Sequence, residues 1–196
     1  MYIMKHLVII ALAAAFAFSG CKSDYERLLD AGLSSGVRQD SIFLGITFGM
    51  SRKDFYSHCW EMNRDSIIRQ GKDNTAVLYV IDKGMRDVVD MNFYPNFTAE
   101  GRIYEMPVTF EYRGWAPWNK ELQSDSLLVE VIGLLEQWHG SKFLRLERAG
   151  RGIVHVAVDG NRRILVHPQN ERFVRVLYTD MTVEPPKPAA AEAGEK

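Results

Sequence analysis

The first 21 residues determine how much of this chain is left to fold. A short positive stretch, Lys5-His6, precedes an unbroken apolar run from Leu7 to Phe18. A helix that spans a bilayer needs about 20 apolar residues, and this run has roughly a dozen. The run is therefore typical of the central part of a signal peptide. We expect residues 1–20 to be a removable leader and the fold to be built from the rest.

The residues that end the apolar run, Phe18-Ser19-Gly20-Cys21, resemble the lipobox of bacterial lipoproteins. The resemblance covers only this segment, and an ordinary signal peptide followed by a chance cysteine is the alternative. It implies a diacylglycerol on the Cys21 thiol and cleavage that leaves Cys21 as the first mature residue. Because each buried CH₂ contributes about 0.8 kcal/mol, two or three acyl chains form a stable membrane anchor.

The residues after Cys21 bear on localisation. Lys22 stands where an Asp would commonly signal retention in the inner membrane, and Lys22-Ser23-Asp24-Tyr25-Glu26 is similar to the export signal of Bacteroidetes surface lipoproteins. These resemblances imply the cell envelope and its outer membrane. The periplasmic face and the surface face both remain open.

Composition excludes one class of partner. The chain has 24 Lys and Arg against 25 Asp and Glu, a net charge of −1, so it lacks the positive excess that nucleic-acid binding requires. If Cys21 is acylated, Cys59 is the one thiol left and no intrachain disulfide can form. We expect Cys59 to be buried, because an exposed lone thiol is a liability in an oxidising envelope.

Two polar stretches flank the part of the chain that can bury a core. Residues 21–39 predict a tether between the membrane and the fold, and residues 182–196, rich in Pro, Ala, Glu and Lys, predict a disordered tail. Between them, two helices are expected. Ser51 is a suitable N-cap for a helix that runs to about Met62, and Ser124 for another over Asp125–His139.

Each predicted helix precedes a series of short apolar runs that indicate strands. The runs are residues 75–81, 88–94, 102–112, 143–148, 153–158, 163–166 and 172–178. Asp159-Gly160 predicts a tight hairpin between two of them. Pro107 lies inside the third run, which favours an edge strand or a bulge there.

A helix followed by an antiparallel meander thus occurs twice. We predict two α+β units, residues 40–112 and 122–181, joined by a connector, residues 113–121. The alternative is a single α+β domain with one longer antiparallel sheet. Either way the fold class is α+β.

Two short motifs in the folded part of the chain resemble those of a known group of domains. Gly49-Met50-Ser51 opening a helix, and Leu134-Leu135 to Gly140 closing one before strands, look like the helix-then-meander domains of the β-lactamase-inhibitor-protein-like (BLIP-like) and outer-membrane-assembly (BamE-like) lipoproteins. The resemblance implies a sheet with helices packed on one face. It also implies function through protein–protein contact.

The sequence offers no arranged catalytic set. His155 and His167 could approach each other across the predicted hairpin, but two imidazoles without a third ligand make a poor zinc site. There is no phosphate-binding glycine loop and no Cys-x-x-Cys. We therefore predict no cofactor, no metal and no enzymatic activity. An unrecognised hydrolase would need two carboxylates facing each other in a deep pocket.

The connector holds the candidate binding residues. Tyr112, Trp115 and Trp118 lie on a segment with Gly and Pro, where flat amphipathic rings suit a protein contact or sugar stacking. The alternative is that both indole rings fill the space between the two halves. The leading hypothesis is a non-enzymatic lipoprotein that binds or scaffolds another envelope protein, and the second is a glycan-binding accessory lipoprotein.

Overall fold

The structure, a computed structural model, describes residues 22–71, 75–148 and 152–185. The predicted leader, the lipidation residue Cys21 and most of the predicted tail lie outside the described residues. The described part is α+β, as predicted. Its helices are α2 (Asp24–Ser34), α3 (Arg52–Arg64) and α4 (Ser124–His139), with a short 3₁₀ turn, η2 (Lys120–Leu122), before α4.

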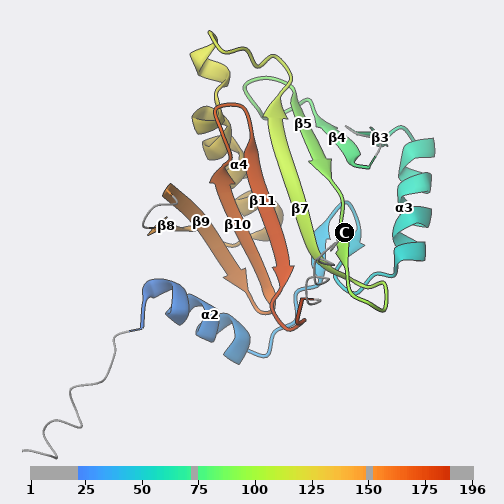
Figure 1. Ribbon diagram of the computed structural model, residues 1–196, viewed down its shortest axis with the longest axis vertical. Coiled ribbons are helices and arrows are strands. Elements are labelled where there is room, and N and C mark those ends of the chain that lie inside the picture. Colours follow the sequence, from blue (N-terminus) through green and yellow to red (C-terminus); the bar gives the residue numbers. More distant parts are fainter. Residues whose placement is uncertain (1–21, 72–74, 149–151, 186–196) are drawn as a thin grey trace, which may run out of the picture.

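Within the described residues, nine strands form one antiparallel sheet in the order β3-β4-β5-β7-β11-β10-β9-β8, with β6 paired to part of β7 (Figure 1). A separate hairpin is formed by β1 (Ser41–Phe43) and β2 (Ile46–Thr47). The strands of the sheet are β3 (Ile68–Gln70), β4 (Val77–Ile81), β5 (Val89–Phe93), β6 (Asn96–Phe97), β7 (Ile103–Tyr112), β8 (Leu144–Arg148), β9 (Gly152–Asp159), β10 (Arg162–Pro168) and β11 (Val174–Asp180).

The strands of the two predicted units join in this single sheet. The last long strand of the first series, β7, pairs antiparallel with the last strand of the second, β11, so that Val108 lies opposite Val176. The alternative of one longer antiparallel sheet therefore fits. Each meander follows its own helix along the chain, and both meanders end at the β7–β11 pair.

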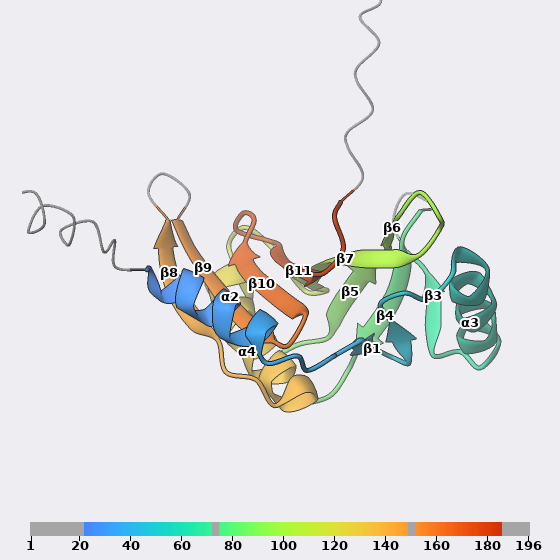
Figure 2. The same ribbon diagram turned by 90° about the horizontal axis from the view of Figure 1, so that it is seen from below.

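One face of the sheet carries most of the core. Figure 2 shows α4 packed beneath that face, where its residues Leu127, Val131 and Leu135 are buried. The β1–β2 hairpin covers the same face, because the Phe43 ring packs edge-on against Phe93 at a centroid distance of 4.9 Å. The alternating strand residues that meet these elements are buried: Val89, Met91, Phe93, Met106, Val108, Phe110, Val174, Val176 and Tyr178.

The two predicted helix caps have different outcomes. Ser51 caps α3 as predicted, its hydroxyl accepting the N–H of Asp54 at 3.1 Å. The predicted Ser124 cap is wrong, because α4 begins at Ser124 itself, and the N-cap residue Gln123 makes no side-chain capping bond to the first turn of the helix. The Ser124 N–H instead donates to the carbonyl of Glu171 at 2.8 Å, which ties the start of α4 to the β10–β11 loop.

The helix α3 lies beside the edge strand β3 (Figure 1), with Phe55 and Met62 buried as the predicted stripe requires. Cys59, on the same stripe, is partly buried and not fully buried as expected. Desolvation by burial raises the pKa of its thiol to about 11. At neutral pH the thiol is therefore protonated and a weak nucleophile.

Of the two alternatives predicted for Pro107, an edge strand or a bulge, the edge strand is wrong. Its strand, β7, is central, and Pro107 lies opposite Leu177 of β11. On the other side of β7, pairing with β5 ends at Val108 and pairing with β6 begins at Glu105. The proline thus falls at an interruption of the ladder, where its missing N–H costs no regular strand pair.

Part of the predicted tether packs on the fold. In α2, the Tyr25 hydroxyl accepts a hydrogen bond from Arg163 of β10 at 3.0 Å, and Gly32 lies against Val158 of β9. Ser41, just after the predicted tether, is also hydrogen-bonded to the sheet, because Arg162 of β10 donates to its carbonyl at 2.7 Å. Among the described residues, no helix combines the length and the apolar character that crossing a bilayer requires.

Replacing Gly32 by valine is expected to detach α2 from the sheet. A Cβ at this position would overlap the Val158 side chain, so the helix must move away. We expect amide exchange of residues 24–34 to become about tenfold faster or more, with the melting temperature of the rest unchanged. Ala31→Val, which adds the same side chain on the exposed side of α2, is the control. Unchanged exchange in Gly32→Val would show that α2 is not held by this contact.

Candidate functional site

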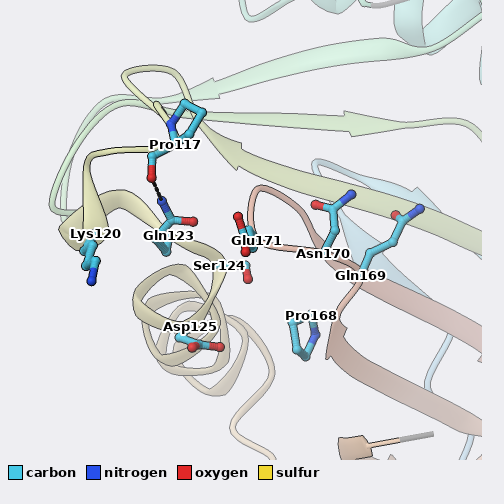
Figure 3. Close-up of a pocket in the computed structure, with 9 residues that line it drawn as sticks. All are labelled: Pro117, Lys120, Gln123, Ser124, Asp125, Pro168, Gln169, Asn170 and Glu171. Carbon is cyan, nitrogen blue, oxygen red and sulfur yellow. Dashed lines mark hydrogen bonds between the residues drawn. The ribbon is translucent and has the colours of Figure 1, made fainter.

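The connector and the β10–β11 loop lie at the same end of the sheet (Figure 1). Between them is a cavity of about 590 Å³, which we call the connector cavity. Figure 3 shows the residues that line it: Pro117, Lys120, Gln123, Ser124, Asp125, Pro168, Gln169, Asn170 and Glu171. Most of these side chains are polar, and they come from two segments about 50 positions apart in the chain.

Gln123 holds the connector in place. Its side-chain N–H groups donate to the carbonyl oxygens of Ala116 and Asn119, both at 3.2 Å. A longer bond to the Pro117 carbonyl is drawn in Figure 3. Its amide oxygen accepts the indole N–H of Trp115 at 3.4 Å. One side chain at the start of α4 therefore satisfies several groups of a loop that pairs with no strand in the described part of the chain.

The opposite wall of the connector cavity is the β10–β11 loop, whose backbone is also held by hydrogen bonds. The Asn170 side-chain oxygen accepts the N–H groups of Arg172 and Phe173, both at 2.9 Å, which closes a tight turn between β10 and β11. The Glu171 carbonyl accepts the Ser124 N–H from α4. The Ser124–Glu171 bond thus joins the two walls of the cavity.

Trp115 is partly buried. The Arg172 guanidinium stacks over its ring at 5.1 Å from the centroid, and the Arg172 Nε–H donates to Glu111 at 2.6 Å. The side chain of Glu111 is almost completely buried. This chain of contacts, from a buried carboxylate through a guanidinium to an indole, fixes the Trp115 ring.

Trp118 is placed differently, with 85% of its surface exposed. The alternative in which both indole rings fill the space between the halves therefore applies to Trp115 in part and not to Trp118. The third predicted residue, Tyr112, is fully buried, and its hydroxyl donates to Glu130 of α4 at 2.7 Å. Burial, followed by this bond, raises the pKa of Tyr112 far above its ordinary value. Tyr112 thus fixes the root of the connector and is not on its surface.

The connector cavity offers hydrogen bonding without a recognisable reaction centre. Its ionisable side chains are Lys120, Asp125 and Glu171, so it has both signs of charge. Within the described ranges, no group of three His, Cys, Asp or Glu residues could hold a metal ion. His155 and His167 do not meet, because Val166 lies opposite His155 and successive strand residues face opposite sides of the sheet.

The connector end is opposite to the end where the N-terminal segment attaches. Strand β10 begins at Arg162, which is bonded to Ser41, and ends at Pro168, which lines the cavity. At about 3.3 Å per residue, the strand separates these two ends by roughly 20 Å. Trp118 therefore lies far from the residues that follow the predicted lipid anchor.

The β10–β11 loop was not among the predicted site residues. Its Pro, Gln and Asn residues indicated only a break between strands, and no local pattern shows that this loop meets the connector. Comparisons with models of known protein families, with curated proteins and with solved structures find no match to this chain. The geometry of the site is therefore the basis of the functional proposal.

Proposed function

We propose that this chain is a lipid-anchored protein of the cell envelope that binds another envelope protein through its connector end, without catalysing a reaction. The observation that carries the proposal is the Trp118 side chain, which is 85% exposed. It lies on a loop that Gln123 stabilises through hydrogen bonds to Trp115 and to the Asn119 carbonyl. The lipobox-like residues before Cys21 support the anchor.

The hydrogen bonds that hold the connector lower the entropy cost of binding a partner. An exposed indole offers a large, rigid surface of the kind that dominates protein interfaces. Ordering a mobile loop on binding costs free energy, and a loop that is already hydrogen-bonded avoids part of that cost. The connector has this property, since Gln123 bonds its backbone at Ala116 and at Asn119.

The test is crosslinking in cells of the anchored protein, followed by mass spectrometry, for the unchanged chain and for Trp118→Ala. We expect one dominant protein partner whose recovery falls about tenfold or more in the variant. Trp60→Ala is the matched control, because Trp60 on α3 is also exposed but lies away from the connector. Cys21→Ser removes the thiol proposed for acylation and should release the protein from the membrane fraction.

Two results would contradict the proposal in different ways. A partner retained by Trp118→Ala but lost in Trp60→Ala would move the contact surface to α3. Turnover of an envelope substrate by the purified chain would contradict a role limited to binding.

A glycan is the second candidate ligand, and the polarity of the connector cavity favours it. Amide and carboxyl side chains such as Gln169, Asn170 and Asp125 suit sugar hydroxyls. The exposed Trp118 follows Pro117, a lining residue, in the chain. Titration with a panel of envelope glycans should then change the tryptophan fluorescence of the unchanged chain and not that of Trp118→Ala. Unchanged fluorescence across the panel would rule against this candidate.

A further inference from the structure

Strand β8 is the last strand at one edge of the sheet. It pairs with β9 on its inner side, and along its outer side no strand pairs with it among the described residues (Figures 1 and 2). An edge strand of this kind presents N–H and C=O groups that can pair with another chain. At the opposite edge, by contrast, α3 lies beside β3.

The side chains of β8 are arranged in two rows. Arg145 and Glu147 share one face and are exposed, with 55% and 74% of their side-chain surfaces accessible, and they form an ion pair at 3.0 Å. Leu144 and Leu146 share the other face and are partly buried. The outer edge therefore has an apolar row on one side and one charge of each sign on the other.

We propose that β8 pairs with β8 of a second copy of this chain, antiparallel about a two-fold axis at Leu146. In this register Arg145 lies opposite Glu147 of the partner subunit, and Glu147 lies opposite Arg145 of the partner subunit. Leu146 lies opposite its own counterpart. The edge is thus complementary to itself in charge, as a two-fold interface requires.

The charges select this register over its neighbours. In an antiparallel pair, side chains that lie directly opposite each other point to the same face of the sheet. The register can therefore shift only by two residues at a time, which moves the two-fold axis by one residue. Moving the axis to Arg145 places two arginines opposite each other, and moving it to Glu147 places two glutamates opposite each other. Like charges directly opposite destabilise a strand pair, while opposite charges stabilise it.

This inference is independent of the proposed function. None of the residues that line the connector cavity belongs to β8, so the dimer and the connector end use separate surfaces. The pairing would join two nine-stranded sheets through their β8 edges into one continuous sheet.

Charge exchange tests the register. The full chain in detergent is compared by sedimentation velocity with Arg145→Glu, with Glu147→Arg and with the double exchange. The unchanged chain is expected to sediment as a dimer at high concentration. Each single variant places like charges opposite each other twice and should raise the dissociation constant about tenfold or more. The double exchange restores both pairs and should return the constant to its original value.

Disulfide crosslinking gives a second measurement. In a Cys59→Ser background, Leu146→Cys should form a covalent dimer on oxidation, because the two thiols lie opposite each other at the axis. Arg69→Cys on β3, at the other edge of the sheet, is the control and should not crosslink. An unchanged chain that stays monomeric at every concentration, single variants that dimerise as it does, or equal crosslinking at both edges would each overturn the proposal.

Discussion

Replacing Phe110 by alanine is expected to lower the free energy of unfolding by about 3–5 kcal/mol. Phe110 is fully buried in the central strand β7, directly opposite Met91 of β5 and Val174 of β11. The change removes apolar atoms where both halves of the sheet meet, and neighbours that are paired on both sides cannot close the cavity. Because domains are typically stable by 5–15 kcal/mol, much of the stability would be lost.

Urea denaturation followed by circular dichroism measures this effect. Trp118→Ala is the control, and because its ring is exposed we expect a change within about 0.5 kcal/mol. A loss below about 1 kcal/mol for Phe110→Ala would mean that the β7–β11 pair is not the centre of the core.

The second large expected effect is a loss of folding stability at low pH. His139 ends α4, and its Nε2 is 3.1 Å from the hydroxyl of the buried Tyr178. Burial, and secondarily the charge of Arg162, lowers the pKa of His139 from 6.5 to about 4. The unfolded chain therefore binds this proton more readily than the folded chain does, and acid favours unfolding.

The contribution of His139 is complete above pH 6.5 and is lost as the pH falls toward 4. Over that window we expect a loss of about 1–3 kcal/mol, because each pKa unit corresponds to about 1.4 kcal/mol and solvent screens the partly exposed ring. Urea midpoints measured between pH 7 and 4 test this. His139→Gln should flatten the profile. A profile that is unchanged in His139→Gln would assign the acid sensitivity to other groups.

Local structure was largely predictable from the sequence. Ser51 and Asp54 predicted the start of α3, because the capping bond involves residues three positions apart. Asp159-Gly160 predicted the tight β9–β10 hairpin, in which Gly160 takes a positive φ of 58°. In both cases the residues that determine the structure are neighbours in the chain.

Long-range structure was less predictable. Ser124 has the chemistry of an N-cap, but its N–H finds a partner in Glu171, 47 positions later, and the helix begins one residue earlier than the local pattern indicates. Whether the halves share a sheet depends on the β7–β11 register, which no local pattern encodes. The wall of the connector cavity that Asn170 and Glu171 form depends on the same tertiary arrangement.

The candidate site was therefore found in part. Aromatic residues in a Gly and Pro segment indicated the connector, but the sequence could not tell the exposed Trp118 from the stacked Trp115 or the buried Tyr112. That distinction depends on Arg172 and Glu130, which reach the connector from other elements.

The β7–β11 pair also has a consequence for the time at which the protein can fold. Val108 can pair with Val176 only after Val176 has been added to the chain, 68 positions later. At a synthesis rate of about 5–20 residues per second, the interval is roughly 3–14 seconds. During that time β7 is a long apolar strand whose later partner has not been made, and such edges aggregate readily. Until β11 pairs with it, the open edge of β7 is therefore the part of the sheet most exposed to aggregation.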